Sequence, residues 1–494
     1  MAVTPLHRTE APLAGSWARD PDPWGPRLLW IALALGLLRF FHLGTWSLWL
    51  DEAFTLADSE HRSGLANPLG YSLFDFFYGL SGSRPSEAWM RFPAALFGWL
   101  TIPATYWAFR PLVGRRVAGV AALVVALSTW QLYWSQNARF YTLAQLLTTL
   151  GGGLFLRSLW AGSTGRAGLG IAVAGAAALA HPSAVLLLVP LMAAPWVAFW
   201  ASRLPRGGEV PWTLLSIVLF GGALFGAGWA IEVWATWSEQ KGQSSTLHLV
   251  VTTGYYLTPT VGLAMVLGAV RILRDRAHGG FFVLLVCLGG LTVAFLASLF
   301  VRVSAQYVFV LLPWLALLAG SAFGRSTPEA NAGPGLGVTA LGLVLMLAPN
   351  VGEQALYFGL RHGDRPRWKE AYRYVFDQRA EEDLILGMDA PVGVYYWDPH
   401  TTDLRRWSNI TWLDTWRLDH VFDWARFPRT TWFILNHEQL YDWTPEQREE
   451  ILSVLEQDCE LMESFTVPLI PRDLDVHVYR RGPVGKTVDA AAGE

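Results

Sequence analysis

Residues 46–55 read Trp-Ser-Leu-Trp-Leu-Asp-Glu-Ala-Phe-Thr and follow directly on the first apolar run, which starts at Leu28. Two adjacent carboxylates, Asp51 and Glu52, are therefore expected near a membrane surface, among bulky apolar side chains. A carboxylate in such a setting costs free energy unless it is paired or has a function. The plain alternative is that Asp51 caps a helix that starts at Glu52. This stretch places two carboxylates shortly after an apolar segment of the kind that crosses a membrane. The rest of the chain is interpreted from this combination.

The chain around this stretch has the composition of a membrane protein. Of its 494 residues, 52% are hydrophobic and 16% are charged, whereas about 25% charged residues is usual for a soluble protein. A spanning helix needs roughly 20 mostly apolar residues. Runs of this kind lie near residues 28–45, 93–109, 117–134, 138–157, 168–180, 183–200, 212–234, 250–270, 279–301, 305–323 and 334–350. The sequence thus predicts an all-α polytopic bundle of about eleven transmembrane helices.

The distribution of arginine orients this bundle. Short cytoplasmic loops collect Lys and Arg, and every second predicted loop is basic, beginning with the N-terminal tail 1–27. The two runs around His181-Pro182 could also be one kinked helix, which would reverse everything downstream. Because the arginine pattern favours two separate spans, the N-terminus is predicted on the cytoplasmic side and residues 351–494 on the outer side.

The last part of the chain has a different character. Charged residues gather there, and short buried strands are predicted at residues 383–386 and 431–435. Thr444 with Gln447 predicts a capping box at the start of a helix. The predicted domains are a cytoplasmic tail (1–27), a transmembrane domain (28–350) with a long first outer loop (46–92), and an extracytoplasmic α/β domain (351–494).

Composition also excludes several function classes. The sequence has no basic stripe or arm, which argues against nucleic-acid binding. The two cysteines, Cys287 and Cys459, lie in unlike surroundings and fit neither a disulfide framework nor a metal-ligand spacing. No glycine-rich phosphate loop is present, so no nucleotide site is expected. We expect no required cofactor, with a divalent cation as the open alternative.

The stretch at residues 48–53, Leu-Trp-Leu-Asp-Glu-Ala, resembles the first-loop motif of the GT-C membrane glycosyltransferases, in particular the polyprenyl- or dolichyl-phosphate-mannose mannosyltransferases and the aminoarabinose transferases. Further segments match in order: 67–71 (Asn-Pro-Leu-Gly-Tyr) where the family often has His-Pro-Pro-Leu-Tyr, 90–98 with its Arg-x-Pro, 114–118 at the first inner turn, 135–143 with Ala-Arg-x-Tyr, and 180–182 with His-Pro. The match covers roughly residues 28–200. It departs from the family at Asn67, which replaces the usual His, and at Gln306-Tyr307, which replaces an Arg-Tyr pair.

The resemblance implies that Asp51 is the catalytic base. Glu52 is the second catalytic candidate, which would position the acceptor, hold a divalent ion or orient Asp51. Arg139, beside Tyr141 at the outer end of a span, would grip a donor phosphate through parallel hydrogen bonds; the alternative is that Arg139 reaches the lipid headgroups. The other candidates are Arg91 and Arg302 for the donor phosphate, and His181, Asn67, Tyr71, Lys241 and His248 for the substrate.

The expected function is transfer of a sugar from a polyprenyl-phosphate donor to a lipid, glycan or protein acceptor, with inversion at the anomeric carbon. The expected location is the outer face of a bacterial inner membrane. Two alternatives stay open: a transporter or flippase of lipid-linked sugars, and a degenerate relative that binds such a substrate without catalysis. A transporter would be expected to show inverted repeats and broken helices at mid-membrane.

Overall fold

The computed structural model describes residues 22–60, 67–82, 84–204, 210–240, 245–275, 278–324, 336–397, 410–413, 429–469 and 472–482. The chain forms two compact units, and each is described by itself. The helical unit comprises Met1–Phe41, Gly64–Tyr71 and Pro93–Gln354, and the mixed unit comprises His42–Ser63, Ser72–Phe92 and Ala355–Glu494. Most of the first predicted outer loop therefore belongs to the same unit as the C-terminal part of the chain.

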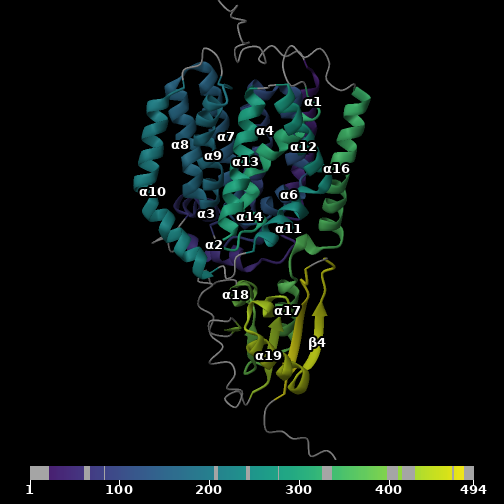
Figure 1. Cartoon of the computed structure of the whole chain (residues 1–494). Helices are drawn as coiled ribbons and strands as arrows, with labels where there is room; N and C mark the ends of the chain where they lie inside the picture. Colours follow the sequence, from purple (N-terminus) through teal and green to yellow (C-terminus); the bar gives the residue numbers. More distant parts are fainter. Residues whose placement is uncertain are drawn as a thin grey trace, which may run out of the picture. The chain divides into compact units, whose positions relative to one another are not determined.

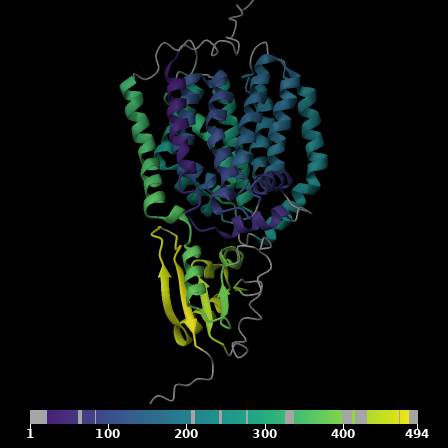
Figure 2. The same ribbon diagram turned by 180° about the vertical axis from the view of Figure 1, so that it is seen from behind.

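The long helices of the helical unit run side by side, as Figures 1 and 2 show. Its helices, in chain order, are α1 (Trp24–Gly36), η2 (Leu37–Phe40), most of α4 (Glu87–Val113), α5 (Arg115–Leu127), α6 (Thr129–Ser135), α7 (Tyr141–Ala161), α8 (Thr164–Ala180), η3 (Pro182–Ala184), α9 (Val185–Trp200), α10 (Trp212–Gln240), α11 (Thr246–Leu257), α12 (Pro259–Arg274), α13 (His278–Ser298), α14 (Ala305–Val308), η4 (Phe309–Leu311), α15 (Leu312–Ser321) and most of α16 (Leu336–Gly359).

Small residues allow neighbouring helices of this unit to approach closely. Helix α7 packs along α8, and α1 packs along α5. A Cβ atom added at Gly151 would lie 2.4 Å from the backbone nitrogen of Ala174, and one added at Gly170 would lie 2.5 Å from that of Phe155. Glycine is therefore required at both positions, as is usual where helices pack without intervening side chains.

Two helices among the described residues are long and apolar enough to cross a membrane by length and composition, Pro182–Trp200 and His278–Ser298. The number rises to four if each of two bent helix pairs counts as one span. The count of about eleven spans stays a prediction.

Both bent pairs lie in segments where the sequence predicted a single span. Helices α5 and α6 meet at 59°, and α11 and α12 meet at 93°. The first break falls at Ser128, whose hydroxyl accepts a hydrogen bond from the backbone N–H of Gln131 at 3.3 Å and caps α6. The second falls at Thr258, because Pro259 disfavours a helical conformation in the residue before it.

The carbonyl groups that the first break exposes are satisfied by polar side chains. Arg39 donates to the carbonyl oxygens of Val125 at 2.8 Å and Ala126 at 3.3 Å, and Gln354 donates to that of Leu127 at 2.7 Å. An arginine inside an apolar run is costly unless it has partners. Arg39 thus closes the C-terminal end of α5.

The mixed unit contains a five-stranded sheet of order β2-β1-β3-β5-β4. Strand β3 lies in the middle, parallel to β1 and antiparallel to β5. Its elements are α2 (Leu50–Glu60), most of α3 (Pro68–Gly79), η5 (His362–Asp364), α17 (Trp368–Gln378), β1 (Leu384–Gly387), α18 (Ala390–Trp397), β2 (Thr411–Trp412), β3 (Thr431–Leu435), η8 (Gln439–Asp442), α19 (Pro445–Asp458), β4 (Glu460–Phe465) and β5 (Val476–Arg481).

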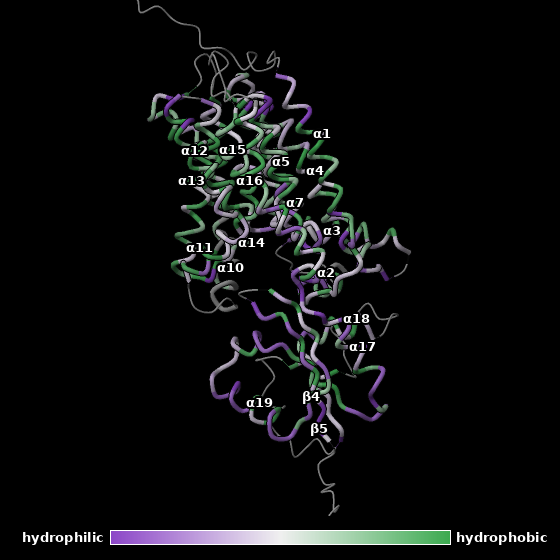
Figure 3. The backbone as a smooth tube through the Cα atoms, turned by 90° about the vertical axis from the view of Figure 1, so that its right-hand side faces the viewer, coloured by the Kyte–Doolittle hydropathy of each residue, from purple (hydrophilic) through white to green (hydrophobic). Residues whose placement is uncertain are grey.

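The core of this sheet lies along β3, where all five residues are buried. Both strands predicted from buried runs are present, and the predicted capping box forms between Thr444 and Gln447 at the start of α19. Figure 3 shows the contrast in hydropathy: helices such as α13 and α15 are largely hydrophobic, whereas α19 and its surroundings are largely hydrophilic.

Candidate active site

The turn that carries Asp51 and Glu52 is the N-terminus of α2. The backbone N–H groups of Glu52 and Ala53 both donate to the carbonyl oxygen of Trp49, at 3.0 and 3.3 Å. Glu52 in turn accepts the N–H of Trp49 on Oε2 at 3.3 Å. This reciprocal pattern satisfies backbone donors at the helix start, and both acidic residues lie where the helix dipole favours negative charge.

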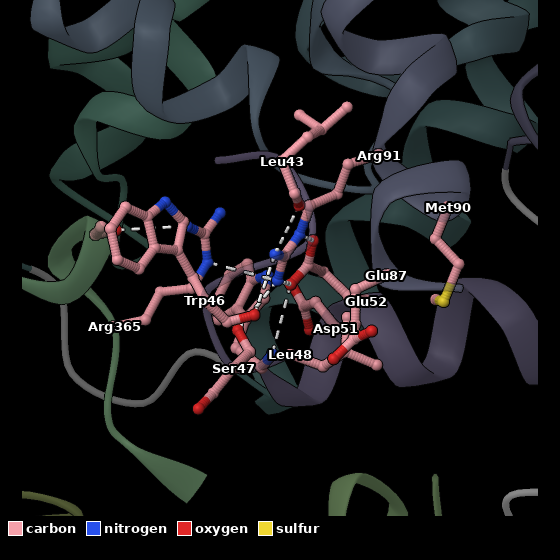
Figure 4. Close-up of polar contacts among 12 residues, drawn as sticks. Leu43, Trp46, Ser47, Leu48, Asp51, Glu52, Glu87, Met90, Arg91 and Arg365 are labelled. Carbon is pink, nitrogen blue, oxygen red and sulfur yellow. Dashed lines mark hydrogen bonds and ion pairs between the residues drawn. The ribbon is translucent and has the colours of Figure 1, made fainter. Parts of the chain in front are cut away.

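Glu52 is fully buried and forms a bidentate ion pair with Arg91 (Figure 4). Arg91 Nε donates to Oε1 and Nη2 donates to Oε2, each at 2.7 Å. Arg91 also donates to the carbonyl oxygens of Leu43, Trp46 and Ser47, at 2.8 to 3.1 Å. A guanidinium has five N–H groups, and these contacts use all of them. The pair therefore fixes the chain that leads into α2.

A second arginine approaches the same carboxylate. Arg365 Nε lies 3.8 Å from Glu52 Oε2, and its Nη1 donates to the hydroxyl of Tyr357 at 3.3 Å and to the carbonyl of Gly363 at 3.2 Å. Two buried cations thus stabilise the charge of Glu52. A fully buried carboxylate whose two oxygens both accept hydrogen bonds from a guanidinium is shielded from a reacting group.

Asp51 precedes Glu52 on the same turn but has a different environment. It is half-buried, whereas Glu52 is not exposed at all. Its backbone carbonyl accepts the hydroxyl of Thr55 at 2.9 Å, which is a contact within α2. Figure 4 shows Asp51 beside the Glu52–Arg91 pair. Of the two carboxylate residues, Asp51 is the one with exposed surface.

In the helical unit, the structure brings several predicted residues together around His181. The rings of Tyr141 and His181 lie 4.2 Å apart, and that of Tyr307 stacks on His181 at 6.3 Å. Trp134 lies 4.3 Å from Tyr141. Trp134 and Tyr307 were not predicted as site residues. Tyr307 could have been found from its place in the altered Arg-Tyr pair.

The tautomer of His181 follows from its partners. Its Nδ1 accepts the backbone N–H of Ser183 at 3.1 Å and lies 2.8 Å from the hydroxyl of the same residue. A neutral imidazole that accepts on Nδ1 carries its proton on Nε2. The buried His181 ring therefore carries its N–H on Nε2.

Three further predicted residues, Asn67, Tyr71 and Arg139, lie in segments next to this group. The carbonyl of Asn67 accepts the N–H of Tyr71 at 3.0 Å as α3 begins, and both residues are buried. The ring of Tyr71 meets that of Phe140 edge-on at 4.6 Å. Arg139 is half-buried, with its guanidinium 5.5 Å from the ring of Phe140.

Two of the three remaining predicted residues lie in the described part of the chain. Arg302 is exposed just before α14. His248 is half-buried in the first turn of α11, and its backbone N–H donates to Ser245. Lys241 lies outside the described residues. Within the described part of the chain, no cluster of three or more His, Cys, Asp or Glu is placed to hold a metal ion.

No protein-family model and no curated protein matches the chain. Solved structures do match it. An oligosaccharyltransferase of Archaeoglobus fulgidus, tethered with an acceptor peptide, is 10% identical with a TM-score of 0.53, over 94% of this chain and 74% of that chain.

Two other solved structures match with lower TM-scores. ArnT of Cupriavidus metallidurans, bound to undecaprenyl phosphate, is 14% identical with a TM-score of 0.47, over 95% of this chain and 99% of that one. The arabinofuranosyltransferase AftD from Mycobacteria is 15% identical with a TM-score of 0.47, over 94% of this chain and 40% of that one. The likeness to the oligosaccharyltransferase shows that this chain has the GT-C fold, which the first-loop motif predicted.

Proposed function

We propose that this protein transfers a sugar from a polyprenyl-phosphate carrier to an acceptor, with inversion at the anomeric carbon. The fold is that of an oligosaccharyltransferase whose structure holds an acceptor peptide. The observation that carries the proposal is the half-buried Asp51 on a turn that a saturated, fully buried Glu52–Arg91 pair holds in place. Such a turn offers one carboxylate to a substrate in a fixed position.

In this mechanism Asp51 is the general base. An acceptor hydroxyl or amine attacks the anomeric carbon, Asp51 takes the proton from the attacking group, and the lipid phosphate leaves. Glu52 and Arg91 act as positioning residues. This division replaces the phosphate contact expected of Arg91 from the sequence, because all its N–H groups already have acceptors.

The residues around His181 are proposed to bind the donor. An N–H on Nε2 and the guanidinium of Arg139 suit a phosphate, which develops charge as it leaves. The rings of Tyr141 and Tyr307 pack against the His181 ring and would fix its orientation toward the donor. Arg302, His248, Lys241, Asn67 and Tyr71 stay predictions for donor or substrate contacts, and a divalent cation stays an optional addition.

The proposed setting is the outer face of a bacterial inner membrane, with the N-terminus in the cytoplasm and residues 351–494 as an extracytoplasmic domain. The acceptor is a lipid, a glycan or a protein. The proposal rests on the arginine distribution along the chain.

The test is transfer of radiolabelled sugar in membranes that contain the wild type, Asp51→Asn or Asp377→Asn, with a panel of polyprenyl-phosphate sugars. Asp377 is exposed on α17 and serves as the matched control. We expect transfer by the wild type and the control, and a loss of roughly a hundredfold or more with Asp51→Asn, as is usual when a general base is removed. Equal transfer by all three would exclude Asp51 as the base. No transfer by any would favour the transporter or the degenerate relative.

A further inference from the structure

The stretch that enters α2 is held by residues that lie more than 300 positions later in the chain. Leu48, three residues before Asp51, donates its backbone N–H to the hydroxyl of Tyr396 at 2.8 Å. We propose that the C-terminal part of the mixed unit positions Asp51 for proton transfer, with Tyr396 as the principal positioning residue and Ser47 as a second anchor. The inference rests on the proposed function and assigns part of it to a distant segment.

Tyr396 is suited to this contact. It lies near the end of α18, and its hydroxyl meets Leu48, whose side chain has no exposed area. Burial raises the pKa of the Tyr396 hydroxyl well above its ordinary value, with Glu87 adding to the rise, so the phenol stays neutral. A neutral hydroxyl accepts one N–H while its own proton turns elsewhere. The contact therefore persists over the pH range in which the protein would work.

Ser47 makes a second link from the same stretch. Its hydroxyl accepts the backbone N–H of Lys369 at 3.1 Å and donates to Glu370 Oε2 at 3.3 Å. Lys369 lies in the first turn of α17, where backbone N–H groups lack partners within the helix. A serine of the first loop therefore caps a helix of the C-terminal part. Lys369 Nζ also binds Glu87 Oε1 at 2.6 Å, which ties the start of α4 to the same helix.

A turn with left-handed backbone conformation packs against the same stretch, at Trp46. His362, Gly363 and Asp364 have φ angles of 49°, 65° and 52°. This conformation is unfavourable for residues with a Cβ. A Cβ added at Gly363 would lie 2.6 Å from Cδ1 of Trp46, so the turn fits against the indole ring. Strain of this kind is retained only where the surroundings enforce it, often at functional sites.

These contacts converge on three consecutive residues, Trp46, Ser47 and Leu48, just before the helix that carries Asp51. A displacement of about 1 Å at a reacting group can lower a rate by about a hundredfold. Tyr372 provides the contrast. Its buried hydroxyl donates to the carbonyl of Met388 at 2.6 Å, so this hydrogen bond does not involve residues 46–48. Its loss should weaken the fold without moving Asp51.

The experiment compares Tyr396→Phe with Tyr372→Phe in purified full-length protein, in both wild-type and Asp51→Asn backgrounds. We expect Tyr396→Phe to lower kcat roughly tenfold, the effect of about one hydrogen bond, with little change in the KM for the donor. The same change in the Asp51→Asn background should have no further effect, because Tyr396 acts through Asp51. Tyr372→Phe should lower thermal stability and leave kcat unchanged.

Hydrogen exchange of the peptide 46–52 gives a readout that needs no activity. Tyr396→Phe should speed exchange at Leu48, since that N–H loses its acceptor, and Tyr372→Phe should not. Unchanged exchange, or an equal loss of kcat in both Asp51 backgrounds, would overturn the positioning role. An inactive wild type would overturn the proposed function, while exchange would still decide whether Tyr396 holds the turn.

Discussion

The turn that carries Asp51 and the hinge between α6 and α7 (residues 134–139), which carries Arg139, are held by different forces. Buried charges fix the turn, where Arg91 alone makes five hydrogen bonds. Aromatic contacts and amide hydrogen bonds fix the hinge: Trp134 packs on Tyr141, and Gln136 donates to the carbonyl oxygens of residues 39 and 41. A charge-held turn should fail when one partner is removed, and it should respond to pH. A hinge held by aromatic packing should lose less stability when a single side chain is changed.

The largest effect is expected from Glu52→Gln. This change leaves Arg91 and Arg365 buried without the carboxylate between them, which costs about 3–5 kcal/mol for a buried pair. Chemical denaturation of the purified protein measures it, with Glu449→Gln on the exposed face of α19 as control. If Glu52→Gln left stability intact but lowered kcat as far as Asp51→Asn does, Glu52 would be a catalytic group. The claim that buried charges hold the turn would then be wrong.

The next effect is a dependence on pH. Burial lowers the pKa of His362 to about 4, while Glu370 opposes the shift. The folded pKa lies below the ordinary value near 6.5. Neutral His362 therefore stabilises the folded chain fully above pH 6.5, and this contribution is lost as pH falls towards 4. At 1.36 kcal/mol per pKa unit, the loss is on the order of 3 kcal/mol.

Unfolding free energies of the wild type and His362→Gln between pH 7 and pH 4 isolate this contribution. The wild type should lose more stability than the variant over this range. Parallel curves would show that His362 plays no part in it.

A smaller effect is expected in the helical unit from Arg39→Met. The carbonyl oxygens of Val125 and Ala126 lose their donor, which costs about 2 kcal/mol if they stay unpaired. Thermal unfolding in detergent measures it, with Arg274→Met as control, because the Arg274 side chain is 76% exposed. A change below about 0.5 kcal/mol, as for an ordinary surface site, would mean that other groups close the end of α5.

The smallest effect is expected at His181, which has two roles. Its Nδ1 accepts the Ser183 N–H, and its Nε2 N–H is the proposed contact to the donor. His181→Ala removes both the acceptor for the Ser183 N–H and the ring, and loss of such a cap costs about 1 kcal/mol. His181→Asn keeps an acceptor near that N–H but lacks the Nε2 donor. We expect Asn to retain stability and both variants to bind the donor more weakly. Donor binding by His181→Asn equal to wild type would exclude His181 as a donor contact.

Local patterns predicted local structure well. The buried run at Thr431–Leu435 became a central strand, and the Thr444 and Gln447 pair became a capping box. The break at Thr258 also had a local signal in Pro259, which the apolar run around it obscured. In each case the decisive residues are neighbours in the sequence.

The parts that sequence did not predict depend on distant partners. Asp51 and Glu52 are adjacent and chemically alike, and only the position of Arg91, 39 residues away, separates their roles. The link from Leu48 to Tyr396 spans 348 residues and involves a backbone N–H, which carries no sequence signal. Arg365 likewise lies in a segment with no motif. Pairing of this kind is set by tertiary packing.

The distance between these partners has a consequence for synthesis. Arg91 can reach Glu52 soon after the first loop is made, but Tyr396 and Lys369 emerge only after most of the chain has been translated. Contacts between segments so far apart form late, and domains begin to fold as they emerge. A nascent or truncated chain would therefore already contain Asp51 without the anchors of its turn. The turn would reach its final geometry only after residues 369 and 396 have been made and have folded against it.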